Sequence, residues 1–81
     1  MIAELSFVPL SSDENLEKYY DEAKTIVEAS GLKYENSRFG VVIEGEWREV
    51  MRVAKSCHQK MTEMSDRVST NIRLDHSNNG Q

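Results

Sequence analysis

The stretch Ser37–Trp47, with the sequence SRFGVVIEGEW, contains the change of periodicity that decides the fold. Its first part alternates, so that Phe39, Val41 and Ile43 fall on one face of an extended strand. From Trp47 onward the apolar residues recur at intervals of three and four, which is typical of an amphipathic helix. The stretch therefore predicts a strand that is followed almost at once by a helix.

This helix begins at Trp47, with acidic Glu46 and Glu49 in the region of its first turn, where the helix dipole favours negative charge. Its apolar residues form one stripe, made of Val50, Met51, Ala54, Cys57, Met61 and Met64. Methionines can also line adaptable binding grooves, but their helical spacing here favours a role in filling the core.

Towards the N-terminus, residues 3–8 alternate between apolar and polar side chains and predict a half-buried strand that Pro9 ends. Ser11 and Glu14 have the spacing of a capping box and predict the start of another helix. The expected apolar stripe of that helix comprises Leu16, Tyr19, Tyr20, Ala23, Ile26 and Val27. Gly31 is the expected stop, because glycine adopts the left-handed conformation that often follows a helix.

Two further strands complete the pattern. Residues 32–36 form a short strand, joined by a tight turn to the strand of the opening stretch, and residues 68–74 alternate again. The order βαββαβ predicts an α+β, ferredoxin-like sandwich, in which two helices cover one face of a four-stranded antiparallel sheet with strand order 4-1-3-2. We expect a single domain over residues 1–75 and a flexible C-terminal tail over 76–81.

Composition narrows the classes of function. A chain of 81 residues buries a small core, which favours self-association. Ten scattered basic residues against 14 acidic ones give a net charge of -4, which argues against nucleic-acid binding. We expect a cytoplasmic protein that does not interact with membranes, because no long apolar run or secretory signal is visible and the chain has one cysteine.

No catalytic or metal-binding motif is recognisable, so we expect a protein that is not an enzyme and has no metal or cofactor. Cys57 and His58 are adjacent, whereas metal ligands on one helix are three or four residues apart. Cys57 also belongs to the apolar stripe, where burial would raise its pKa and make the thiol inert.

The predicted sheet face that points away from the helices is polar. With the expected strand order it carries Glu4, Ser6, Arg38, Glu44, Ser69, Asn71 and Arg73 within cross-strand reach of one another. This surface is a solvated sheet face, a subunit interface sealed by ion pairs, or a ligand site. The residues alone leave these interpretations open.

The chain resembles the small thiamine-binding proteins of the YkoF type. The resemblance rests on four segments in order, AELSFVPL, ASGLKYE, FGVVIEGEWREVMRVAKSCH and DRVSTNIRLD, and covers about residues 2–75. Glu44 and Gly45 match the Glu-Gly at the strand end of that family, and Trp47 opens its second helix. Val41 stands where the family often has a hydroxyl residue, and we expect its side chain to face the helices.

The resemblance implies non-catalytic binding of thiamine or its hydroxymethylpyrimidine part by a homodimer or homotetramer, for sequestration, delivery or sensing. Acidic and aromatic groups suit the thiazolium cation, and carboxylates or amides suit the aminopyrimidine edge. The candidate ligand-binding residues are Glu44, Glu4, Ser6, Arg38, Asn71 and Trp47. The alternative is a structural or interaction protein whose polar sheet face mediates assembly with subunits or another partner.

Overall fold

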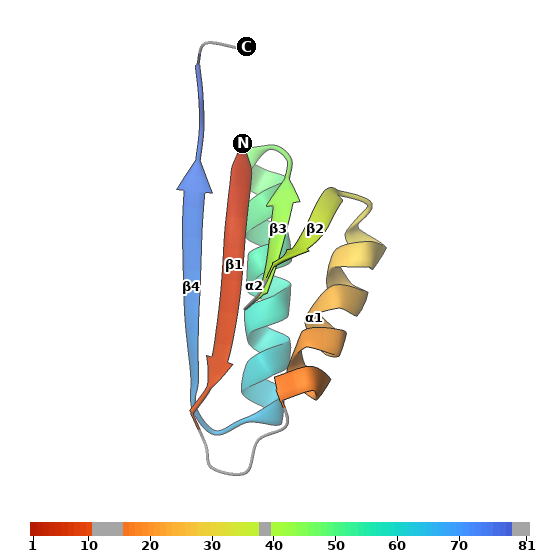
Figure 1. The fold of residues 1–81 in the computed structure, drawn as a ribbon, viewed down its shortest axis with the longest axis vertical. Coiled ribbons are helices and arrows are strands. Elements are labelled where there is room, and N and C mark those ends of the chain that lie inside the picture. The colour runs from red at the N-terminus through yellow and green to blue at the C-terminus, as the bar shows by residue number, and fades with distance from the viewer. Residues whose placement is uncertain (11–15, 38–39, 79–81) are drawn as a thin grey trace.

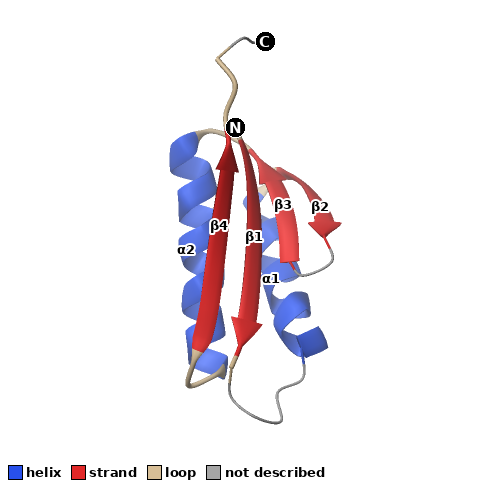
Figure 2. Cartoon of the chain, turned by 60° about the vertical axis from the view of Figure 1, so that its left-hand side comes forward, coloured by secondary structure: helices blue, strands red, loops and turns tan. Residues whose placement is uncertain are grey.

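The computed structural model describes residues 1–10, 16–37 and 40–78. Its elements are β1 (Ile2–Pro9), α1 (Leu16–Ser30), β2 (Lys33–Ser37), β3 (Gly40–Glu44), α2 (Trp47–Met64) and β4 (Val68–Asp75). The four strands form one antiparallel sheet in the order β2-β3-β1-β4, and both helices lie on the same side of it (Figures 1 and 2). This confirms the predicted ferredoxin-like fold and its strand order.

The register of the strands shows which residues share a face of the sheet. Leu5 of β1 lies opposite Val41 of β3 and Ile72 of β4, so these three side chains point to the helices. Val41 is buried there, as predicted. The neighbouring residue Ser6 lies opposite Gly40 and Asn71, on the open face of the sheet.

The core lies between the two central strands and the helices. From β1, Ala3, Leu5 and Phe7 are fully buried, because this strand is flanked on both sides and covered from above. The other buried apolar residues are Tyr19, Ala23, Val27, Val41, Ile43, Val50, Val53, Ala54, Cys57 and Met61. Tyr19 donates a hydrogen bond from its hydroxyl to the carbonyl of Met64 over 3.0 Å, which ties α1 to the end of α2.

The apolar stripe of α1 differs from the prediction at one end. Tyr19, Ala23 and Val27 are buried as expected, but Leu16 is exposed, because it stands in the first turn, beyond the edge of the covered core. Gly31 follows the helix with a φ of 78°, the left-handed conformation that its position predicts. The predicted capping box at Ser11 and Glu14 lies outside the described residues.

In α2 the predicted start at Trp47 is confirmed, and Val50, Ala54, Cys57 and Met61 are buried. The stripe also includes Val53, which packs in the core and which the sequence pattern did not single out. No helix within residues 16–37 and 40–78 is long and apolar enough to cross a bilayer.

Gly40 is required by the close approach of β3 to β1. A Cβ atom at this position would collide with the backbone carbonyl of Leu5, which belongs to the central strand and cannot move aside as a flexible side chain does. Gly31 has open space around it and is restricted only by its φ.

We predict that Gly40→Ala destabilises the protein by about 3 kcal/mol, because it forces two paired backbones apart. Gly31→Ala is the matched control and is expected to cost about 1 kcal/mol through backbone conformation alone. Chemical denaturation of both variants measures the difference. Equal stability of Gly40→Ala and the unmodified protein would contradict so close an approach of β3 to β1.

Burial raises the pKa of the Cys57 thiol to about 11. Because an unfolded thiol ionises with a pKa of about 8.5, the unfolded chain binds fewer protons than the folded one between about pH 9 and 11. The free energy of unfolding should therefore fall across this window, by up to about 1.4 kcal/mol per pH unit from this group.

Cys57→Ala isolates this effect, since Tyr34 also has a raised pKa and contributes with the same sign. Denaturation curves of both proteins at pH 8 to 11 measure the slopes. If the free energy of unfolding fell with pH equally in the two proteins, the fold would not raise the pKa of the Cys57 thiol.

Candidate functional site

The open face of the sheet carries most of the residues that the sequence singled out. Glu4 lies opposite Val42 and Arg73, and Ser6 lies opposite Gly40 and Asn71, in two adjacent rows across the strands. The Glu4 carboxylate and the Arg73 guanidinium form an ion pair of 3.6 Å between exposed side chains. Glu4, Ser6 and Asn71 are therefore brought together as neighbours.

Glu44 shares this face and lies in the row next to that of Glu4, but two rows from Ser6 and Asn71. It pairs with Ile2, which is four residues from Ser6 along β1, or about 13 Å at about 3.3 Å per residue. Glu44 borders a shallow hollow of about 90 Å³ that Ile2, Lys33 and Glu35 also line. One small ligand cannot contact Glu44 and Asn71 simultaneously without spanning this distance.

Trp47 is not part of that neighbourhood. Trp47 is the first residue of α2, on the helical side of the sheet, and its side chain is 57% exposed. Arg38 lies outside the described residues. Of the five predicted residues that the structure describes, Glu4, Ser6, Asn71 and Glu44 share the open sheet face, and Trp47 lies apart from them.

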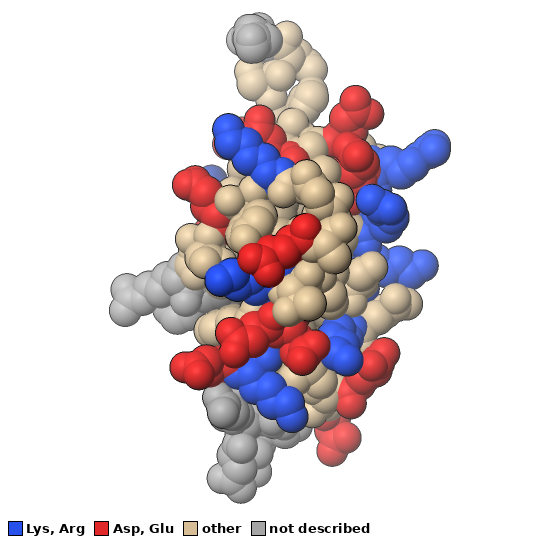
Figure 3. Space-filling view, turned by 90° about the vertical axis from the view of Figure 1, so that its right-hand side faces the viewer, with Lys and Arg blue, Asp and Glu red and all other residues tan. Residues whose placement is uncertain are grey.

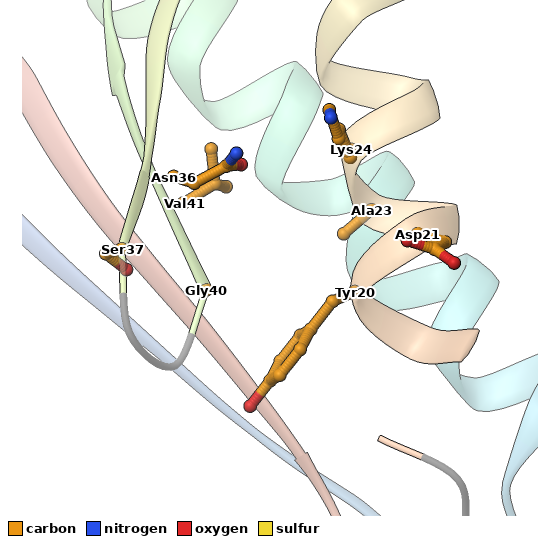
Figure 4. A pocket seen from close by; sticks show the side chains of 8 residues that line it. All are labelled: Tyr20, Asp21, Ala23, Lys24, Asn36, Ser37, Gly40 and Val41. Atoms are coloured by element: carbon orange, nitrogen blue, oxygen red, sulfur yellow. The ribbon is translucent and has the colours of Figure 1, made fainter. Parts of the chain in front are cut away.

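A deeper hollow lies between α1 and the ends of β2 and β3. Its volume is about 230 Å³, and it is lined by Tyr20, Asp21, Ala23, Lys24, Asn36, Ser37, Gly40 and Val41 (Figure 4). We call it the hairpin pocket. Ala23 and Val41 form an apolar floor, because both belong to the buried core.

Two side chains give the hairpin pocket its chemistry. Tyr20 extends from α1 towards the strands, and the Asn36 amide projects from β2 on the side of the helix (Figure 4). Asn36 takes this direction because it pairs with Val41 and lies two residues from Tyr34, whose ring packs against the core. An aromatic face and an amide that can both donate and accept hydrogen bonds therefore border the same space.

A hydrogen bond connects α1 and β2, the two elements that form the walls of the hairpin pocket. The Tyr34 hydroxyl of β2 donates a hydrogen bond of 2.8 Å to the Glu28 carboxylate of α1. This hydrogen bond, followed by desolvation and the negative charge of Glu28, raises the pKa of Tyr34 above its ordinary value. A phenol is protonated at neutral pH in any case, and the raised pKa extends its role as a donor to more alkaline pH.

The rim of the hairpin pocket carries both signs of charge. Asp21 and Lys24 come from successive turns of α1, and the Asp21 side chain is directed away from the pocket floor (Figure 4). Acidic and basic side chains alternate over this whole side of the molecule, which α1 and β2 form (Figure 3). The field around the pocket is therefore mixed and is not uniformly basic or acidic.

The sequence analysis missed the hairpin pocket. The signal that could have found it is the polar side chain of Asn36, which has the same strand parity as Tyr34 and so must face the helices. Tyr20 was assigned to the apolar stripe of α1, whereas it is half-buried and forms a wall of the pocket.

Two further reactive side chains of α2 make contacts with neighbouring elements. His58 Nδ1 lies 2.6 Å from the Thr70 hydroxyl, and the buried Cys57 thiol faces the Ala23 carbonyl at 4.0 Å. Within the part of the chain that the structure describes, no three His, Cys, Asp or Glu side chains are placed to hold a metal ion.

Comparison with known proteins identifies relatives that match most of this chain and a smaller share of their own length. UPF0045 protein MJ1052 of Methanocaldococcus jannaschii is 29% identical over 75 residues, which span 93% of this chain and 75% of that protein. UPF0045 protein sll0230 of Synechocystis sp. is 28% identical over 75 residues, which span 91% of this chain and 62% of that protein.

Solved structures share the fold. The crystal structure of MJ1052 matches with a TM-score of 0.90 and 28% identity, over 99% of this chain and 82% of that one. A Thermotoga maritima protein, provisionally assigned to thiamine biosynthesis or salvage, matches with a TM-score of 0.85 and 24% identity, over 99% and 86%. The family model of thiamine-binding proteins matches residues 3–81, and the chain therefore belongs to the thiamine-binding protein family.

Proposed function

We propose that this protein binds thiamine or its hydroxymethylpyrimidine part without chemical conversion, as a homo-oligomer, and that it serves sequestration, delivery or sensing of the vitamin. The membership of the chain in the thiamine-binding family supports the class of ligand. The arrangement of Tyr20 and Asn36 across the hairpin pocket is the observation that carries the assignment of the site.

The chemistry of the aminopyrimidine fits this pair of residues. The ring nitrogens accept hydrogen bonds and the exocyclic amine donates them, so one amide such as Asn36 can match both at once. A flat heteroaromatic ring also stacks on a phenol such as Tyr20. The apolar floor of Ala23 and Val41 excludes water from beneath the ring.

The size of the hairpin pocket favours the pyrimidine half as its occupant. About 230 Å³ is below the range of about 300–1,000 Å³ that is usual for sites that enclose a whole drug-sized ligand. The thiazolium would then extend to the rim, where the Asp21 carboxylate stands near solvent. With this placement, free hydroxymethylpyrimidine should retain much of the affinity of thiamine.

The open sheet face remains the competing location for the same ligand. Glu4, Ser6 and Asn71 are neighbours there, and the pair of Asn71 and Asn36 offers one amide on each side of the sheet. A substitution at each amide therefore distinguishes the two locations with the same change of chemistry.

Binding should be visible as thermal stabilisation. At a ligand concentration of about 100 times Kd, the free energy of unfolding rises by about 2.7 kcal/mol, which for a domain of this size raises Tm by on the order of 10 °C. Thiamine, its phosphates and free hydroxymethylpyrimidine are titrated in parallel, with calorimetry for Kd. No shift with any of these compounds would contradict thiamine binding.

Substitution of the two asparagines locates the site. We expect Asn36→Ala to weaken binding by about tenfold or more, since a polar ligand then loses its hydrogen-bonding partner in the pocket, whereas Asn71→Ala leaves Kd within about twofold. Both side chains are exposed in the free protein, so both variants should fold. The reverse ranking would move the site to the open sheet face.

A further inference from the structure

Three polar side chains of the hairpin pocket are available to a ligand. Tyr20, Lys24 and Asn36 all line the pocket, and none of them forms a hydrogen bond or an ion pair with another residue that the structure describes. Tyr34, on the same strand as Asn36, differs in this respect, because its hydroxyl donates to the Glu28 carboxylate. A phenol, an ammonium and an amide can therefore all donate hydrogen bonds into one hollow.

These three groups stand at two ends of the hairpin pocket. Lys24 lies on α1 and faces the Asn36 amide of β2 across the end that is farther from the hairpin turn (Figure 4). Tyr20 comes one turn earlier on α1 and extends towards the end that Gly40 borders (Figure 4). The end with Lys24 and Asn36 therefore combines an amide with a positive charge.

The positive charge of Lys24 is not neutralised by its neighbours. Among the described residues that line the pocket, Lys24 is the one cation and Asp21 is the one carboxylate. The Asp21 side chain is directed away from the pocket floor (Figure 4). Glu28, one turn after Lys24 on α1, accepts the hydrogen bond of the Tyr34 hydroxyl over 2.8 Å. A group that extends from the pocket towards Lys24 thus meets a cation without an ion-pair partner among the described residues.

The covalent structure of the pyrimidine directs its substituent to this end. The hydroxymethyl group is attached to the ring carbon next to the one that bears the exocyclic amine. In the proposed orientation, Asn36 pairs with this amine and with the adjacent ring nitrogen. The substituent therefore leaves the ring beside Asn36, on the side where Lys24 stands across the pocket.

We infer that the hairpin pocket prefers the monophosphate ester of hydroxymethylpyrimidine to the free alcohol and to thiamine, and that Lys24 determines this specificity. The inference rests on the proposed function and names the preferred form of its ligand. A phosphate monoester carries about -1.5 to -2 charges near neutral pH and accepts charge-assisted hydrogen bonds from an ammonium. The thiazolium of thiamine is a cation, which the same ammonium repels.

The phosphates of thiamine differ from this ester in one decisive respect. Their phosphate is separated from the pyrimidine by the whole thiazolium group, so it lies beyond the reach of Lys24 when the pyrimidine occupies the pocket. We therefore expect Lys24 to favour the ester of the pyrimidine and to give no comparable gain to the phosphates of thiamine.

Calorimetry with free hydroxymethylpyrimidine, its monophosphate ester and thiamine tests the inference. The unmodified full chain should bind the ester about fivefold more tightly than the free pyrimidine, and Lys24→Gln should bring these two dissociation constants together. Lys24→Arg should keep the preference, because a guanidinium is also positive and binds phosphate. Binding of the free pyrimidine without preference for the ester would overturn the inference alone. No binding of any of the three compounds would overturn the proposed function as well.

Two control variants separate the position of Lys24 from net charge. Lys18→Gln removes the same charge from α1 at a residue that does not line the pocket, and it should keep the preference for the ester. Arg73→Gln removes the cation of the open sheet face, which pairs with Glu4 over 3.6 Å. A preference that depends on Arg73 and not on Lys24 would place the phosphate on the open sheet face and overturn the inference.

Ionic strength supplies a second readout. Raising the salt concentration from about 0.1 M to about 1 M shortens the Debye length from about 10 Å to about 3 Å. The preference for the ester over the free pyrimidine should shrink, while the affinity for thiamine relative to the free pyrimidine should rise, because one ammonium attracts the first ligand and repels the second. Lys24→Glu should reverse both trends. The same salt dependence for the ester and for thiamine would overturn the inference.

Discussion

Leu5 and Phe7 lie on the central strand β1, where both are fully buried between the sheet and the helices. β1 is hydrogen-bonded to β3 on one side and to β4 on the other, so its backbone groups are satisfied while its apolar side chains pack under the helices. Without this strand the hairpin of β2 and β3 and the edge strand β4 would have no common partner. The rest of the structure depends on the burial of this one short segment.

The two helices do not cover the sheet evenly, and two hollows at its margins follow from that. Where α1 meets the ends of β2 and β3, the core stops at Ala23 and Val41, and the hairpin pocket opens above them. At the other edge α2 covers the base of β4 but leaves Ile72 and Leu74 partly exposed, and a groove forms. A chain with so small a core has few apolar side chains available to fill these two hollows.

Much of the fold could be predicted from periodicity, because each element has a clear repeat. The change of spacing after Ile43, the stop at Gly31 and the alternation of β4 all correspond to observed elements. The exposure of Leu16, Ile72 and Leu74 could not be predicted in this way. Periodicity indicates which face of a strand or helix a side chain belongs to. How deeply that side chain is buried depends on where the neighbouring helix packs.

The candidate site illustrates the same division. The amino-acid sequence by itself determined that Glu4, Ser6 and Asn71 share a sheet face, since strand parity and strand order suffice for that. Only the tertiary structure decided that Glu44 lies beside Glu4 but two rows from Ser6 and Asn71, and that Tyr20 and Asn36 border one pocket. The physical reason is that a pocket forms where two elements lie close together but their side chains do not fill the space between them. The packing of the whole core sets the distance between those two elements.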